Sequence, residues 1–197
     1  VAMSNPATLT ATVAAVVAVS NGAFHTLFLL ADHSLWAAGR NGAGELGDGT
    51  HVSRPTLTWV SSDVIAINAG YYDSFFRKID GSTWAMGANG YRELGGGTMT
   101  IYTTPVMIAT DLIATAGGEN HTLLLKADGT LWAVGLNSDG QLGDGTRTDR
   151  QNPVQVASGV VKIAAGQRHS VFLKGDGTMW AMGANNYGQL GDGSYDA

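Results

Sequence analysis

Histidine and carboxylate side chains recur at one spacing along this chain, and metal binding is the chemistry that such a set could perform. His121 and His169 are 169−121 = 48 residues apart, and His25 lies twice that distance before His121. Asp73 takes the same place in the interval between. Imidazole and carboxylate are both good metal ligands. They would converge only in a very narrow ring, so the simpler interpretation is a histidine bonded to the backbone of its own repeat. We therefore predict no metal site and no cofactor.

The residues that could catalyse a reaction are not grouped along the sequence. Serines and histidines fall at equivalent positions of a repeat, and neither a nucleophile elbow nor a phosphate-binding loop is present. The glycines of the LGDG motifs follow predicted strands but open no helix. We therefore predict that the chain is not an enzyme and has no catalytic residues. A site in a central pocket is the alternative, because spacing alone would not reveal it.

Binding residues are better sought where the repeats differ from one another, since a scaffold tolerates variety where side chains leave its core. One variable pair precedes each histidine position, and one variable residue lies in each long loop. Aromatic and arginine side chains on exposed loops are enriched in binding hot spots, although solvated turns without a partner are the plainer alternative. The predicted binding residues are Phe24, Tyr71, Tyr72, Tyr91, Glu119, Asn120, Arg168 and Tyr187.

The element that positions all of these residues is a tandem repeat. The stretch LWAVGLNSDGQLGDGT begins at Leu131 and has three near copies, and each tryptophan stands 48 residues after the one before, as in 132−84 and 180−132. The four tryptophans are Trp36, Trp84, Trp132 and Trp180. A fixed period over the whole chain marks a repeat protein whose units bury their apolar faces against one another. We expect a single domain over 1–197.

The unit spanning 153–194 predicts four short strands. Segments 160–166, 169–174 and 178–183 are apolar or alternating, and Asp176-Gly177 favours a two-residue hairpin turn between the last two. The segment Pro153–Ala157 predicts an edge strand, because proline cannot donate to a neighbouring strand. The first strand of each unit carries small side chains, which suits an innermost position. Four antiparallel strands per unit predict an all-β fold, a β-propeller of four 48-residue blades.

Composition and charge argue against nucleic acid and membranes as partners. The net charge is −5 without any basic run, which argues against nucleic acid. The chain has 28 glycines, as short strands with tight turns require, and no cysteine. The apolar stretch 11–19 is too short to span a bilayer and aligns with the first strand of the other units. We therefore predict a buried strand there and no membrane insertion.

The repeated motif G-x-x-H-[ST]…DG-[ST]-x-W-[AS]-x-G-x-N-x-x-G-Q-L-G-D-G resembles the repeat of the regulator of chromosome condensation family over essentially the whole chain. Its carriers here include Gly22, His25 and Trp36 with their counterparts, and the series headed by Asn41 and Leu46. The resemblance implies a β-propeller, usually of seven blades. Four units leave three arrangements: a closed four-bladed ring, a segment of a larger array, or a ring completed by a second copy.

The N-terminal segment bears on this choice. Residues 5–13 supply a spare strand, and the last unit stops before its fourth strand. The spare strand could complete the last blade or a neighbouring chain's blade and so remove exposed edges. A homodimer that closes an eight-bladed ring is the resulting hypothesis.

The function predicted from these observations is a noncatalytic interaction module or scaffold that binds a protein or a glycan through variable loops. The alternative is a secreted enzyme inhibitor, because the family resembles a bacterial β-lactamase inhibitor that presents aromatic loops. Nucleotide exchange, the activity after which the family is known, is disfavoured because no inserted wedge interrupts the units. Low charge and absent cysteine favour a bacterial extracellular or cell-surface setting.

Overall fold

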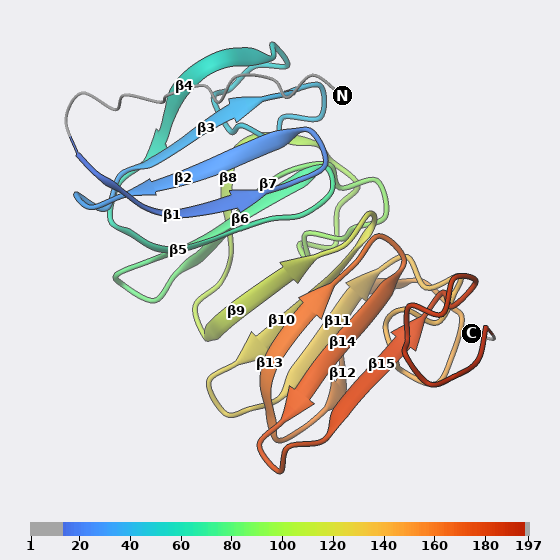
Figure 1. Cartoon of the computed structure of the whole chain (residues 1–197). Helices are drawn as coiled ribbons and strands as arrows, with labels where there is room; N and C mark the ends of the chain where they lie inside the picture. The colour runs from blue at the N-terminus through green and yellow to red at the C-terminus, as the bar shows by residue number, and fades with distance from the viewer. Residues whose placement is uncertain (1–13, 196–197) are drawn as a thin grey trace, which may run out of the picture.

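A computed structural model describes residues 14–195 of the 197-residue chain. The described residues form four antiparallel sheets that follow one another along the chain, which confirms the predicted propeller blades (Figure 1). The N-terminal strand predicted at 5–13 lies outside the described residues. No helix within 14–195 is long and apolar enough to cross a membrane.

The strands of the first two blades are β1 Val16–Asn21, β2 His25–Leu30, β3 Leu35–Gly39, β4 Arg54–Ser61, β5 Val64–Ala69, β6 Asp73–Lys78, β7 Thr83–Gly87 and β8 Tyr102–Ala109. Those of the last two are β9 Leu112–Gly117, β10 His121–Lys126, β11 Leu131–Gly135, β12 Arg150–Ala157, β13 Val160–Ala165, β14 His169–Lys174 and β15 Met179–Gly183. The first three sheets have four strands in sequential order, and the last has three in the described residues.

The predicted order within a blade is confirmed. The first strands β1, β5, β9 and β13 contact one another in succession and so lie innermost. The fourth strands β4, β8 and β12 lie at the opposite sheet edge, and each contains a proline near its start, such as Pro153 in β12. An edge strand tolerates proline because one side of its backbone has no partner strand.

The hairpin between the second and third strands differs from the prediction of a two-residue turn. In the last blade the amide of Lys174 donates to the carbonyl of Thr178, which leaves three residues in the loop. Gly177 has a φ of 87°, in the left-handed region that the last residue of such a loop requires.

The residues that recur in this hairpin in every blade are joined by a series of hydrogen bonds. In blade 3 the carboxylate of Asp128 accepts the amide of Thr130 at 2.9 Å and its hydroxyl at 2.6 Å. The Thr130 hydroxyl accepts the indole N–H of Trp132 at 3.0 Å. Equivalent bonds occur in the other three blades. The D-G-[ST]-x-W motif is therefore explained by turn and strand structure rather than by chemistry at a site.

The core is divided among the three seams between blades. Leu27 and Leu35 of blade 1 meet Phe76 and Met86 of blade 2, all at most 2% exposed. Leu131 of blade 3 belongs to the seam with blade 4. In each seam the same face of one sheet packs on the opposite face of the next sheet. The hydrophobic effect acts between blades, so a unit depends on its neighbours for stability.

The outer faces of the first and last blades have no such neighbour in the described residues. Met179 of blade 4 is 69% exposed, although Leu35 and Leu131 at the equivalent position are fully buried. On blade 1, Val19 is 60% exposed, whereas its counterpart Ile67 packs against the first seam. The prediction of a buried strand at 11–19 is therefore wrong for its described part, because β1 has no blade before it within residues 14–195. The described residues therefore form an open arc of four blades and not a closed four-bladed ring (Figure 1).

Candidate interaction surface

The turns between the two innermost strands of each blade meet at one end of the arc. Backbone hydrogen bonds of 3.0 to 3.3 Å link each turn to the next. The amide of Ala23 donates to the carbonyl of Tyr71, the amide of Tyr71 donates to the carbonyl of Gly118, and the amide of Glu119 donates to the carbonyl of Gln167. Residues of all four turns line a shallow hollow of about 270 Å³. The variable pairs therefore lie side by side, because each turn is bonded to the next.

The long loops reach the same end. The residue that follows each third strand donates its amide to the turn of its own blade, as Arg40 does to the carbonyl of Phe24 at 2.9 Å. Within the loop, the buried side chain of Asn41 donates to Asp48 at 2.9 Å and accepts the amide of Leu46 at 2.9 Å. The internal bonds fix the loop, so its variable residues are presented on a rigid support.

Three of the predicted binding residues lie together with Arg40. We define the aromatic cluster as Phe24, Tyr71, Tyr72 and Arg40. The Tyr71 and Tyr72 rings lie edge to face with centroids 4.6 Å apart, and Phe24 is 6.4 Å from both. Phe24 is 59% exposed. Aromatic pairs in this geometry attract one another beyond the effect of the buried area, so the cluster is held in place before any partner arrives.

Arg40 completes the cluster and was not predicted. Its guanidinium carbon lies 4.7 Å from the Tyr72 ring centroid and 5.8 Å from that of Phe24. Its Nε lies 3.8 Å from a carboxylate oxygen of the buried Glu45. The equivalent residues in the other units are Ala88, Leu136 and Ala184. The same rule of variation between units would have found Arg40.

The other predicted residues do not join the aromatic cluster. Arg168 pairs with Asp139 of the preceding blade's loop at 2.7 Å and donates to Ser138 at 3.3 Å. Tyr91 and Tyr187 stand apart on their loops, 45% and 90% exposed. The remaining two, Glu119 and Asn120, are half-buried in the turn of blade 3.

For His25 and His121, the interpretation of a bond within their own blade is wrong. Nε2 of His25 lies 2.8 Å from the Ser74 hydroxyl of blade 2, and Nε2 of His121 lies 2.9 Å from the Ser170 hydroxyl of blade 4. Each histidine thus connects two blades, because its side chain is on the face that packs against the following sheet. Burial lowers the pKa of both imidazoles to about 4.

Blade 2 carries Asp73 instead of histidine, and its carboxylate oxygens are buried without a hydrogen-bond partner. The Thr122 hydroxyl across the seam also has none. Burial first, and then the nearby Glu93 and Glu45 carboxyls, raise the pKa of Asp73 well above its usual range. Burial also raises the pKa of Glu93. Within residues 14–195 no three histidine or acidic side chains are placed to hold a metal ion.

Family models place these repeats among known proteins. A model of the regulator of chromosome condensation repeat matches 128–173. A second model of that repeat matches 16–45, 113–141 and 160–189. Together the two models match more than half of the chain, and the matched segments contain the seam histidines His25 and His121. The chain belongs to the regulator of chromosome condensation repeat family.

Solved structures confirm the fold of this repeat family for the chain. Human WBSCR16 is 21% identical, with a TM-score of 0.85 over 95% of this chain and 52% of that protein. Yeast RCC1 (Prp20), solved bound to Kap60, is 21% identical, with a TM-score of 0.84 over 95% of this chain and 48% of that one. The ectodomain of the receptor kinase CR4 from Physcomitrella patens is 15% identical, with a TM-score of 0.58 over 86% and 39%.

The chain spans about half the length of the first two structures that it matches. None of the curated proteins is significantly similar to it in sequence.

The glycine and histidine of the family repeat explain each other. A methyl group at Gly22 would lie 2.3 Å from Cε1 of the His25 ring and 2.5 Å from the carbonyl oxygen of Gly70. Gly118 and Gly166 face the rings of His121 and His169 in the same way. At Gly22 and Gly118 only glycine leaves room for the histidine ring that reaches the next blade. In this chain the G-x-x-H pattern of the repeat family therefore contributes to the contact between blades.

Proposed function

We propose that this chain is a noncatalytic interaction module that binds a protein partner through the aromatic cluster. The observation that carries the proposal is the contact among Phe24, Tyr71, Tyr72 and Arg40 at the junction of two blades. Exposed aromatic and arginine side chains on a rigid support lose little conformational entropy on binding. The Prp20 structures support this class of function, since Prp20 was solved bound to Kap60 and has binding properties to Gsp1p and histones.

The chemistry of the surface indicates the kind of protein segment that it fits. Phe24 offers an apolar ring, and Arg40 supplies a positive charge beside it. An exposed segment with an apolar or aromatic residue next to an acidic one would satisfy both. A glycan that stacks on the tyrosines is the competing ligand.

Peptide selection tests this proposal. A random peptide library displayed on phage is selected on the immobilised chain, and binding of the enriched peptides is then measured on variants. Phe24→Ala should weaken binding at least about tenfold, because truncation of a hot-spot aromatic costs about 2 kcal/mol. Arg40→Ala should weaken the binding of those peptides that carry an acidic residue.

Ile79→Ala is the matched control, since Ile79 is also 59% exposed but lies in the hairpin between β6 and β7. It should leave peptide binding unchanged. Equal losses in Phe24→Ala and Ile79→Ala would contradict the proposed surface. A glycan array on which Phe24→Ala alone loses signal, with no peptide enriched, would replace the protein partner by a glycan.

We further propose that a second copy of the chain covers the exposed outer faces of the terminal blades. In each of the three seams, the sheet face equivalent to the Met179 face of blade 4 packs on the next sheet. The face that it meets there is equivalent to the Val19 face of blade 1. Two copies related by a two-fold axis would form this contact twice and close a ring of eight blades.

The mass in solution tests this assembly. Light scattering over a wide concentration range should give a dimer, and Met179→Asp should give a monomer, because a charge in an apolar seam is strongly destabilising. Phe24→Ala, outside the proposed contact, should remain dimeric. A monomeric mass at all concentrations would exclude the homodimer and leave the aromatic cluster as the only proposed surface.

A further inference from the structure

The seam between blades 2 and 3 departs from the other seams at two neighbouring positions. Arg77 stands where Leu29, Leu125 and Leu173 stand in the other blades. Thr83, its partner across β6 and β7, stands where the other blades have Leu35, Leu131 and Met179. In the two remaining seams the leucines of these positions belong to the buried core. Blade 2 has thus exchanged an apolar contact for a cation and a hydroxyl.

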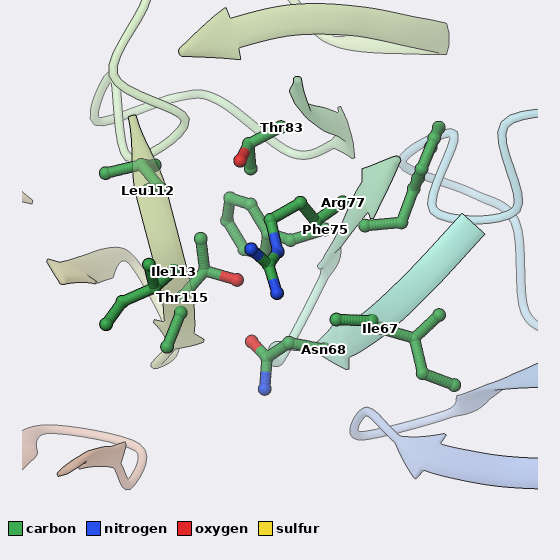
Figure 2. Close-up of a pocket in the computed structure, with 11 residues that line it drawn as sticks. Ile67, Asn68, Phe75, Arg77, Thr83, Leu112, Ile113 and Thr115 are labelled. Atoms are coloured by element: carbon green, nitrogen blue, oxygen red, sulfur yellow. The ribbon is translucent and has the colours of Figure 1, made fainter. Parts of the chain in front are cut away.

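A cavity lies beside Arg77 and Thr83. It has a volume of about 150 Å³ and is bounded by β5 and β9, the innermost strands of the two blades, and by β6. Figure 2 shows the Arg77 guanidinium in the middle of the lining residues, beside the Phe75 ring, with Ile113 on the side of β9. A space of this size exceeds what one water molecule needs.

Two polar groups of the cavity lack hydrogen-bond partners within residues 14–195. Nε of Arg77 and Oγ1 of Thr83 are both buried and without a hydrogen bond, and Thr83 is 2% exposed. Arg77 forms no ion pair with any described residue. In Figure 2 the oxygen atom of Thr115 lies beside the guanidinium, while the side-chain oxygen of Asn68 accepts the amide of Gly117 at 3.0 Å. Burying part of a guanidinium without a counterion is unfavourable, so an anion that enters the cavity would offset this cost.

We propose that this cavity binds a small organic carboxylate, with Arg77 as its anchor. A planar carboxylate can accept from Nε and a terminal nitrogen of the guanidinium together, which is the bidentate geometry that arginine favours. The Thr83 hydroxyl would donate a further hydrogen bond. The side chain of Ile113, which is 43% exposed, would contact a short apolar tail. This apolar wall favours an organic carboxylate over phosphate.

Titration with butyrate and with butyramide tests the proposal, because the two differ in charge but hardly in shape. The ¹⁵N-labelled chain is titrated at constant ionic strength, with chloride as the balancing anion, and amide shifts are followed at Phe75, Thr83 and Leu112. Butyrate should shift these amides with a saturating curve, and butyramide should bind at least about tenfold more weakly. Absent shifts with butyrate, or equal binding of the two, would overturn the proposal.

The repeat itself supplies matched variants. Arg77→Leu installs the residue of the other three blades and should therefore fold, while butyrate binding falls at least about tenfold. Thr83→Val keeps the shape of the side chain and should weaken binding less. Lys78→Leu changes the adjacent charge, which lies over Trp84 and not in the cavity, and should leave binding unchanged. Undiminished binding in Arg77→Leu would overturn the assignment, and Arg77→Gln supplies the same comparison if the leucine variant does not fold.

Discussion

Leu131→Ala should lower the free energy of unfolding by about 2–5 kcal/mol, whereas Met179→Ala should lower it by less than about 1 kcal/mol. The two residues occupy the same position of the repeat. Leu131 is fully buried in the seam between blades 3 and 4, so its truncation leaves a cavity there. Met179 is 69% exposed on the outer face of blade 4 and has little contact to lose. Urea unfolding, followed by circular dichroism at low protein concentration, measures both.

The contrast between the two variants tests the open arc directly. Equal losses would show that the Met179 face is covered even in the single chain. If the loss in Met179→Ala grows only as protein concentration rises, in step with the mass in solution, a second copy covers that face. Leu35→Ala, at the same position of blade 1, should behave like Leu131→Ala because Leu35 is also fully buried.

Acidification from pH 7 to pH 4 should remove about 3 kcal/mol of stability for each of His25 and His121. Burial lowers the folded-state pKa of both imidazoles from 6.5 to about 4. Between these two values the unfolded chain holds protons that the folded chain does not, so the free energy of unfolding falls as the pH falls. Below about pH 4 this contribution is fully lost. Unfolding curves measured at several pH values give the slope.

Variants separate the contribution of these histidines from other effects of acid. His121→Gln should remove about half of the slope, and the double variant with His25→Gln should remove most of it. His51→Gln changes an exposed histidine that is not in a seam and is the control. An unchanged slope in the double variant would contradict the assignment of acid sensitivity to the seams.

Asp73 contributes to the pH profile with the opposite sign. Its folded-state pKa is raised, so its contribution to stability is present below the unfolded value and is lost as the pH rises through the folded value. Asp73→Asn should therefore stabilise the chain at neutral pH and have little effect in acid. It should also steepen the slope that the histidines produce.

The blades could be predicted from the sequence because the repeat supplies four versions of each strand. The predicted strand at 169–174 has the bounds of β14, and the strand predicted from small residues at 160–166 is innermost β13. Alternation identifies the two faces of a strand, and the glycines identify the turns. These are local properties, so they can be recognised without the neighbouring units.

Contacts between units could not be predicted in the same way. The repeat shows that His25 and His121 are equivalent, but it does not show which sheet face is turned toward the following blade. The bond from His121 to Ser170 depends on that choice. The aromatic cluster was predicted in part, since Phe24 and the two tyrosines were named, whereas Arg40 lies in another row of the repeat. Arg77 lies within a strand, where a difference between units is not by itself a sign of a binding residue.

The bond between a histidine and the serine 49 residues later has a consequence for how such chains change length in evolution. The seams between blades 1 and 2 and between blades 3 and 4 join one position of a unit to the adjacent position of the next. Duplication of a unit that carries both the histidine and the serine therefore leaves the new seam with equivalent partners. Unequal crossing-over between units would therefore yield folded products of different length. The number of blades is then limited by the ring that can close, and not by any loss of contacts along the way.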